Sequence, residues 1–364
     1  MNARAAFQSG PFRVVHARHD ADLLWMREPE DYRPCFKTLR PFQLLNHLPN
    51  ESAMSDKGHL AEHLYGYDRV QRADDLGVKD LVQETYCLYL RNDRERFFAQ
   101  VPKEASKDNL WIVKRADSAR GVGIRILWQF DELREFCARA ERPGPGERYA
   151  RYVIQRYIKN PLLLEGRKSE IRVYWLVASL DPLLVLMYRE GTVRLNTQPF
   201  KLDDFENTLI HVTNVAQQKS HPDHDPAAVL KWPFERWERY LVVECKRAPE
   251  GYLERHLKPH LKRMLSFVIR AAAPALRVGC PEQGLCFGLY GADIILDETL
   301  HPWLTEVQEG PGLSFSDATK RPLIPAVLNE AAAIMLEVAR RKRDGQSLET
   351  LESVKGFEWV INEA

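Results

Sequence analysis

The sequence predicts a mixed fold of helices and strands, α+β or α/β, divided into several subdomains. Apolar stretches with the character of strands occur along the same chain as long amphipathic helical patterns. The chain has 364 residues, which allows one domain but favours two or three. Apolar residues make up 45% of the sequence, which is enough for ordinary hydrophobic cores.

The individual elements follow from short-range patterns. Strands are expected where apolar runs are bounded by turn residues: 12–15, 111–114, 124–128, 152–155, 171–180 and 183–188. Helices are expected where the apolar spacing is helical: 55–64, 132–140, 232–246, 252–276 and 322–341. Ser55 or Asp56 can cap the first helix, and the sequence RPGPGER ends the second one.

Charge and cysteine content bear on the class of protein. Lys and Arg number 52 and Asp and Glu number 51, so the net charge of +1 gives no overall attraction to nucleic acid or membrane. The six cysteines form no C-x-x-C pair, so neither a zinc site nor a disulfide framework is expected. A reducing compartment is therefore expected. The N-terminus lacks the apolar segment of a secretory signal, and no run of about 18 apolar residues predicts a membrane span.

The most informative segment is 286–314, which predicts a β-hairpin that carries two opposed carboxylates. An apolar strand is followed by a turn and a returning strand. If Asp297 pairs with Pro302, the antiparallel register places Asp293 opposite Glu306. Directly opposed residues share one face of a sheet, with Cβ atoms about 5 Å apart.

Two interpretations of these carboxylates stay open on the hairpin alone. Two acids at one point of an apolar hairpin repel each other unless a cation lies between them, and oxygen ligands favour Mg²⁺. Gln308 lies two residues beyond Glu306, so its amide points the same way and can join as a ligand. In the alternative, Asp293 and Glu306 pair separately with Arg or Lys side chains.

A loop of small residues after a strand suggests phosphate binding. Lys114 lies at the strand end, and residues 115–123 form the loop. Backbone N–H groups in such loops approach phosphate closely, with the lysine as a point charge. The alternative is an ordinary β-hairpin whose glycines serve the turn.

A second cationic segment lies on a predicted strand. Lys168, Glu170 and Arg172 alternate with apolar residues and therefore share one face of the strand. Such a face suits an anionic substrate and a phosphate, although it could also be the solvated face of an edge strand. Arg189 and Arg194 flank the next turn and can extend this cationic wall.

One histidine pattern raises the question of zinc. His59 and His63 lie one helical turn apart in HLAEH, which matches the pattern of inverted zinc peptidases. A zinc site needs a third ligand, and none is evident in the sequence. Zinc is therefore not expected, and His256 and His260, which share this spacing, are expected at the surface.

Taken together, these segments resemble the tubulin–tyrosine ligase family over roughly residues 36–335. The similar stretches follow the family's order: NHLPNESAMSDKGHLAEHL, WIVKRADSARGVGI, YVIQRYIKNPLLLEGRKSEIRVYWLV, YREGTVRLNTQPF, HVTN and GADIILDETLHPWLTEVQEGPGLS. The resemblance implies the ATP-grasp fold, with the nucleotide held between the central and C-terminal sheets. It also implies four segments, namely an N-terminal subdomain 1–55, a central subdomain 56–159, a C-terminal subdomain 160–345 and a tail 346–364.

The resemblance further implies roles for individual residues. ATP contacts are expected at the positions that match the family's nucleotide site: Lys57, Lys114, Gly121, Gly123, Gln155, Arg156, Tyr157, Ile158, Lys168, Glu170, Thr213 and Asn214. Lys168, Arg172 and Arg194 are the expected catalytic residues. One or two Mg²⁺ ions are expected on Asp293, Glu306 and Gln308, the same residues that the hairpin register brings together.

Two residues depart from the family's pattern. Gln308 stands where the family usually has Asn, and Glu170 stands where it usually has Asp. Both replacements keep the chemical type but lengthen the side chain by one methylene. An active enzyme is therefore expected, with a shifted metal geometry.

The resemblance implies an ATP- and Mg²⁺-dependent carboxylate–amine ligase that works through an acyl phosphate. Glutamate is the expected amino acid, because the cleft is cationic, and the expected acceptor is an acidic protein or peptide such as a tubulin tail. A cytoplasmic monomer without nucleic-acid or membrane partners is expected. The alternatives are the same chemistry on a non-tubulin acceptor, and a nucleotide-binding pseudoenzyme that acts as a scaffold.

Overall fold

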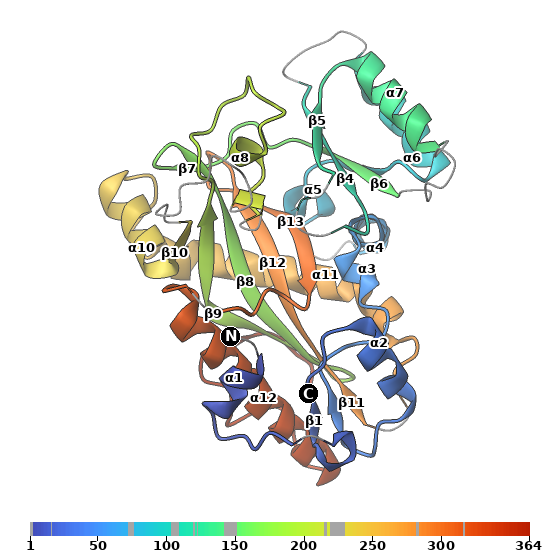
Figure 1. The fold of residues 1–364 in the computed structure, drawn as a ribbon, viewed down its shortest axis with the longest axis vertical. Helices are drawn as coiled ribbons and strands as arrows, with labels where there is room; N and C mark the ends of the chain where they lie inside the picture. The colour runs from blue at the N-terminus through green and yellow to red at the C-terminus, as the bar shows by residue number, and fades with distance from the viewer. Residues whose placement is uncertain are drawn as a thin grey trace.

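The computed structural model mixes helices with three β-sheets, which confirms the predicted mixed class (Figure 1). It describes residues 3–15, 17–71, 76–102, 109–118, 121, 123–141, 151–214, 217–218, 230–281, 284–315 and 317–364. A seven-stranded sheet occupies the middle of the molecule, with a four-stranded sheet at one end and a three-stranded sheet at the other.

The seven-stranded sheet is antiparallel throughout. In order of pairing its strands are β10 (Lys231–Pro233), β9 (Leu183–Leu195), β8 (Arg167–Leu180), β12 (Gly288–Leu296) and β13 (Pro302–Glu309), with β14 (Phe357–Asn362) also on β9 and β7 (Leu163–Leu164) on β8. The long apolar runs predicted as strands thus form its centre. The end of the chain, expected as a tail, contains the strand β14.

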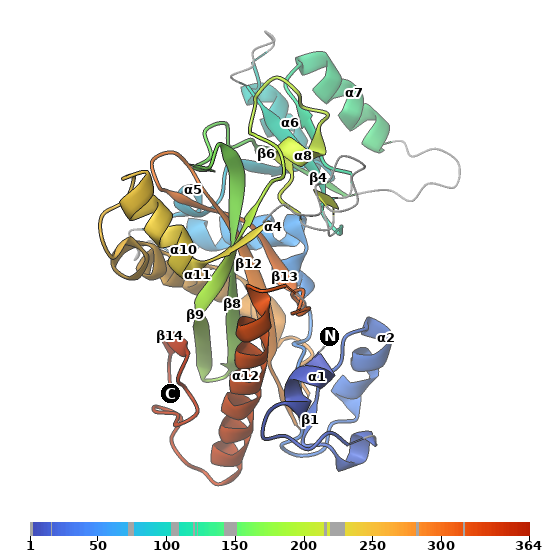
Figure 2. The same cartoon turned by 60° about the vertical axis from the view of Figure 1, so that its left-hand side comes forward.

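Helices cover both faces of this sheet (Figure 2). Successive residues of a strand point to opposite faces, so Trp175 enters the core beneath α11 (Lys258–Arg277) and Tyr174 enters the core beneath α12 (Lys320–Arg343). By length and composition alone, one described helix, α12, could cross a membrane, and 61% of its most apolar stretch is buried inside the fold.

The four-stranded sheet has its own small core. Its strands are β3 (Thr85–Cys87), β6 (Tyr152–Arg156), β4 (Trp111–Arg115) and β5 (Arg125–Leu127), in this order. The helices nearest to it in sequence are α4 (Lys57–Val70), α5 (Val78–Leu81), α6 (Arg91–Gln100) and α7 (Phe130–Glu141). Phe97 of α6 packs edge-on against Trp111, and both side chains are buried. Neither α6 nor β3 was expected from the sequence.

The three-stranded sheet joins the N-terminal region to a distant segment. Its parallel strands are β1 (Leu23–Leu24), β2 (Leu44–Leu45) and β11 (Leu285–Cys286).

The remaining helices that the structure describes are short. They are α1 (Ala3–Gln8), α2 (Pro29–Tyr32), α3 (Ser52–Ser55), α8 (Thr208–His211) and α10 (Phe234–Arg239), with 3-10 turns at Arg18–Asp20 and Arg33–Lys37 and π turns at Tyr240–Glu244 and Leu253–Leu257.

Several local expectations need correction. Residues 12–15 form no strand, although the short apolar run suggested one. Of the two expected caps for the next helix, Asp56 is confirmed: its carboxylate accepts hydrogen bonds from the backbone N–H groups of Gly58 and His59 at 2.9 and 3.0 Å, and the helix begins at Lys57. The sequence RPGPGER, expected to end a helix, lies outside the described residues.

The predicted hairpin exists, and its decisive pair is correct. Asp293 is the register partner of Glu306, as expected. The pairing at the turn was off by one residue, because Pro302 pairs with Leu296 instead of Asp297. A β-bulge at Thr305 adds one residue to β13 and restores the register by the time the chain reaches Glu306.

Candidate active site

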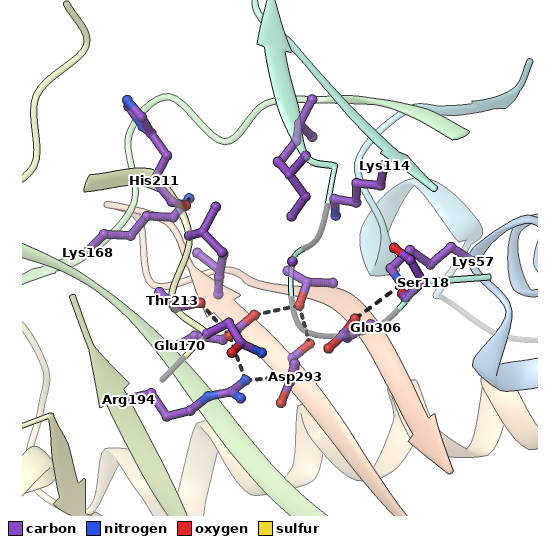
Figure 3. A pocket seen from close by; sticks show the side chains of 17 residues that line it. Lys57, Lys114, Ser118, Lys168, Glu170, Arg194, His211, Thr213, Asp293 and Glu306 are labelled. Atoms are coloured by element: carbon purple, nitrogen blue, oxygen red, sulfur yellow. Dashed lines mark hydrogen bonds and ion pairs between the residues drawn. The ribbon is translucent and has the colours of Figure 1, made fainter. Parts of the chain in front are cut away.

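A cavity of about 90 Å³ lies where the four-stranded and seven-stranded sheets approach each other (Figure 3). The predicted residues that line it come from distant parts of the chain: Lys57, Lys114, Gly121, Lys168, Glu170, Arg194, Thr213, Asn214, Asp293 and Glu306. A second, larger cavity of about 550 Å³ adjoins it and shares Lys57, Arg194, Asn214 and Glu306 as lining residues. Two of the predicted residues, Arg172 and Gln308, line only this second cavity.

Asp293 is held by two arginines at the boundary of the cavities. Its side chain is 1% exposed and accepts hydrogen bonds from Arg172 Nη2 at 2.7 Å and from Arg194 Nη2 at 2.6 Å. Burial alone would raise the pKa of Asp293, but the charges and hydrogen bonds of Arg172 and Arg194 outweigh it and hold the pKa well below its ordinary value. Asp293 is therefore a permanent anion at neutral pH.

Glu306 is less well compensated. Its Oε2 atom lies 3.4 Å from Lys57 Nζ, and its Oε1 atom accepts a hydrogen bond from the amide of Gln308. Burial and the nearby charge of Asp293 raise the pKa of Glu306 above its ordinary value, although Lys57 opposes this. The alternative interpretation of the hairpin, in which each acid has its own cationic partner, thus describes the arrangement without a metal.

Gln308 connects these two carboxylate systems. Its amide nitrogen donates to Glu306, and its Oε1 atom accepts a hydrogen bond from Arg172 Nη2 at 2.8 Å. The expectation that Gln308 points to the same side as Glu306 is confirmed by this contact.

Glu170 is fixed from three sides. Its Oε2 atom accepts hydrogen bonds from the Thr213 hydroxyl at 2.5 Å and from Arg194 Nη2 at 2.6 Å. Its Oε1 atom accepts from the hydroxyl of Thr305, the bulge residue, at 2.8 Å. The carboxylates of Glu170, Asp293 and Glu306 consequently face one cavity (Figure 3).

Three lysines approach the same cavity. Burial, and then the neighbouring charge of Lys57, lowers the pKa of Lys114 to about 8. Burial likewise lowers the pKa of Lys168 to about 8. Lys57 Nζ donates to the backbone oxygen of Ser118 at 2.7 Å, which ties α4 to the loop after β4. Buried ammonium groups that lack full compensation are suited to a polyanionic ligand.

The residues expected at an adenine hinge lie beside the cavity. Gln155 accepts a hydrogen bond from Lys114 Nζ at 2.9 Å and donates one to Thr85 Oγ1 at 2.9 Å, so its side chain lies behind Lys114. Arg156 pairs with Glu84, and Ile158 is half-buried. None of these residues lines the cavity of about 90 Å³, and neither do Tyr157 and Gly123, although Tyr157 contacts Lys168, which does.

The structure adds site residues that the sequence did not indicate. Apolar side chains form part of the first cavity: Ile112, Ile124, Val212 and Ile295. Two lysines, Lys231 and Lys320, line the second cavity together with Arg172 and Arg194. Burial, and then the charge of Lys231, lowers the pKa of Lys320 to about 7. No sequence motif marks these lysines, because they come from β10 and the first turn of α12.

Some predicted groupings are absent. Arg189 is exposed and lines neither cavity, so its expected place in the cationic wall was wrong. His63 Nδ1 is hydrogen-bonded to the backbone oxygen of Ala53 at 3.1 Å, and His59 lies 4.0 Å from Asp56. Within the described part of the chain, no three His, Cys, Asp or Glu side chains are grouped so that they could hold a metal ion, whereas the expected magnesium set contains two acids and an amide.

Comparisons with known proteins assign the chain to the ATP-dependent amino-acid ligases, which form peptide or isopeptide bonds. The model of the tubulin-tyrosine ligase family matches residues 36–343, which is most of the chain, and the chain therefore belongs to this family.

Curated relatives carry the names of tubulin polyglutamylases. The chain is 35% identical over 354 residues to the probable tubulin polyglutamylase TTLL9 of Rattus norvegicus, covering 88% of this chain and 73% of that protein. It is 30% identical over 305 residues to the probable tubulin polyglutamylase TTLL2 of Homo sapiens, covering 80% and 47%. It is 27% identical over 296 residues to the probable tubulin polyglutamylase ttll-9 of Caenorhabditis elegans, covering 80% and 68%. The chain thus spans about half to three quarters of these relatives.

Proposed function

We propose that this protein uses ATP and Mg²⁺ to join glutamate through an amide bond to a carboxylate of a protein or peptide acceptor. The observation that carries the proposal is the pair of adjoining cavities. One combines buried lysines with acidic oxygen ligands, and the other is lined by six cationic and four acidic side chains. The first cavity suits a nucleoside triphosphate with its metal, and the second cavity suits substrates that carry carboxylates.

The nucleotide is proposed to lie between the four-stranded and seven-stranded sheets, as in an ATP-grasp fold. In this proposal Lys57, Lys114 and Lys168 offset the phosphate charge, and the backbone near Gly121 and Gly123 approaches the phosphates. The apolar side chains of the first cavity and the backbone of 155–158 would hold the base, and Thr213 and Asn214 would close the site. Segments 1–55, 56–159 and 160–345 are the corresponding proposed subdomains.

The residues at the hairpin fit a hard divalent cation. Asp293, Glu306 and Gln308 offer carboxylate and amide oxygens, which are the ligands that Mg²⁺ prefers. The raised pKa of Glu306 shows that its negative charge is incompletely compensated by the protein. A cation at this position would remove that cost, and Asp293 and Gln308 would then exchange hydrogen bonds to Arg172 for the metal. When bound, Mg²⁺ would neutralise charge on the β and γ phosphates.

The chain's own residues would position reactants more than they would react. A carboxylate must attack the γ-phosphorus, with ADP leaving, and the amine of the second substrate then displaces phosphate from the acyl phosphate. Buried lysines lower the repulsion between the anionic reactants, and Arg172 and Arg194 can each clamp a carboxylate in a planar fork. The lysines that line the second cavity extend this clamp to a substrate with two carboxylates, such as glutamate.

The relatives support the choice of glutamate and of an acidic acceptor by analogy. Their names describe tubulin polyglutamylases, and a tubulin tail is the corresponding proposed acceptor for this chain. All six cysteines are free thiols, which agrees with the proposed reducing, cytoplasmic setting.

The test is intact-mass analysis of acceptor peptides after incubation with ATP, Mg²⁺, a mixture of amino acids and the full chain. The proposal expects a mass increase of one or more glutamate residues and formation of ADP. ATP binding without ADP formation on any acceptor would instead indicate a nucleotide-binding scaffold.

A further inference from the structure

A series of buried hydrogen bonds leads from Lys168 in the first cavity to the segment 196–211, which follows β9. Lys168 Nζ donates to the Tyr157 hydroxyl oxygen at 3.3 Å and to the backbone oxygen of His211 at 3.0 Å. The Tyr157 hydroxyl lies 2.8 Å from His211 Nδ1, and His211 Nε2 lies 2.8 Å from the backbone oxygen of Asp204. Lys168, Tyr157 and His211 are each only 3% exposed.

The two ends of this chain determine where every proton lies. The Asp204 carbonyl can only accept, so His211 Nε2 carries a hydrogen. The Lys168 ammonium can only donate, so the Tyr157 oxygen accepts from it and its own hydrogen points to His211 Nδ1. A neutral His211 with a free Nδ1 lone pair satisfies all four groups, whereas a protonated imidazole would place two donors in contact.

The surroundings keep His211 neutral. Phe205 stacks on the imidazole with ring centroids 5.7 Å apart, and Phe200 packs edge-on at 5.9 Å. Burial lowers the pKa of His211 below its ordinary value. The hydrogen bond to the Asp204 carbonyl opposes this shift, and the charge of Lys168 adds to it. The imidazole therefore accepts from Tyr157 across the neutral pH range.

The segment 196–211, which follows β9 and ends with α8 and His211, is fastened beside Lys168. The backbone N–H of Asn196 donates to the Lys168 carbonyl at 3.0 Å, and the Asn196 amide donates to the Ile210 carbonyl at 2.5 Å. Both ends of this segment therefore lie beside Lys168: Asn196 binds its backbone, and the His211 carbonyl binds its ammonium group. Two of the three ammonium N–H groups of Lys168 are used by Tyr157 and His211, which leaves the third for a ligand in the cavity.

We propose that Tyr157 and His211 are positioning residues that hold the Lys168 ammonium in place for the nucleotide. The inference rests on the proposed function, since it requires the first cavity to bind ATP. It assigns the hydroxyl of Tyr157, a residue expected only as part of a backbone hinge, a role through Lys168. It also assigns a role to His211, which the sequence did not single out: its neutral tautomer with hydrogen on Nε2 accepts the hydrogen bond from Tyr157.

The test is the equilibrium affinity of the full chain for ADP with Mg²⁺, measured by calorimetry without amino acid or acceptor. Tyr157→Phe keeps the ring and removes only the hydroxyl, and we expect ADP to bind about tenfold more weakly, as for one lost hydrogen bond to a charged group. In a Lys168→Met background the same substitution should have no further effect, because it acts through that ammonium. Tyr86→Phe is the matched control: its buried hydroxyl bonds Glu84 and Gln100 and lines neither cavity, so ADP affinity should not change.

His211 supplies a second, independent comparison. Asn at this position can place an amide oxygen near the Nδ1 position and accept from Tyr157, whereas Leu cannot. We expect His211→Asn to bind ADP within a few-fold of wild type and His211→Leu to lose about tenfold. This pair decides the question even if one of the tyrosine variants unfolds, which thermal unfolding would reveal.

The outcomes separate the two levels of inference. A wild-type chain that binds no ADP overturns the proposed function, and the role of Tyr157 and His211 with it. A wild-type chain that binds ADP while Tyr157→Phe binds equally well overturns the positioning role alone. Additive losses in the Lys168→Met background, or equal behaviour of the Asn and Leu variants, overturn it too.

Discussion

Asp293→Ala and Glu306→Gln should have very unequal effects on stability, although the two carboxylates face each other. Asp293 is the shared partner of Arg172 and Arg194, which are 5% and 9% exposed. Its removal leaves two buried guanidinium charges without this compensation, and such a loss typically costs about 3–5 kcal/mol. Repulsion between two opposed acids would by itself predict that the fold tolerates the loss of either one, but the two arginines bound to Asp293 reverse this prediction for that residue.

Glu306→Gln should cost little and can stabilise the protein. The pKa of Glu306 is raised in the folded state, so its ionised form is disfavoured there relative to the unfolded chain. The folded state then binds more protons than the unfolded state between the two pKa values, and wild-type stability falls as pH rises through that window. The Gln variant lacks this dependence and keeps the shape of the side chain.

The assay is urea denaturation at neutral pH, followed by circular dichroism, without nucleotide or metal. Asp31→Ala serves as the control, because Asp31 and its partner Arg18 are both more than half exposed and lie 3.4 Å apart. Such a surface pair contributes about 0–1 kcal/mol. An Asp293→Ala midpoint equal to that of the control would refute the reasoning, as would a Glu306→Gln protein that is several kcal/mol less stable than wild type. Both variants should lose ligation activity under the proposed function.

Three further predictions concern the chemistry. Gln308→Asn should keep measurable ligation with a changed Mg²⁺ requirement, whereas Gln308→Leu should lose most activity. The measurement is the ligation rate as a function of Mg²⁺ concentration, and equal rates for the two variants would show that the amide does not bind the metal. The double variant His59→Ala with His63→Ala should ligate normally, and one zinc per purified wild-type chain, found by elemental analysis, would reverse that expectation. Competition among labelled glutamate, tyrosine and glycine with tubulin-tail peptides should favour glutamate, and incorporation of either other amino acid without glutamate would contradict the substrate assignment.

The sequence predicted the parts of the fold that depend on local pattern. The long strand β8 and the helix α12 lie close to where their apolar spacing placed them, and β9 begins where expected but continues seven residues farther, to Leu195. The short strand β3 and the polar helix α6 were missed, because three residues carry little periodicity and α6 exposes much of its surface. The final strand β14 depends on pairing with the distant β9, which no local pattern encodes.

The candidate site was predictable where residues are neighbours along a strand and less so where they meet across the fold. The opposition of Asp293 and Glu306 followed from pairing rules, yet the predicted register was correct there only because the bulge at Thr305 offsets an error at the turn. The two arginines on Asp293 come from β8 and β9, and their convergence depends on the order of the sheet, in which β8 lies between β9 and β12. Sequence spacing could not reveal that the acids are compensated so unequally.

The two departures from the family's pattern make sense as parts of one hydrogen-bonded arrangement. Gln308 reaches Arg172 with its oxygen and Glu306 with its nitrogen, so one side chain links the well-compensated Asp293 to the less well compensated Glu306. Glu170, the other longer side chain, has both of its oxygens occupied, one of them by the hydroxyl of the bulge residue Thr305. The bulge that sets the register of Glu306 therefore also supplies a donor that holds Glu170. Because each lengthened side chain has specific partners, both departures are better explained as adjustments of a working site than as signs of decay.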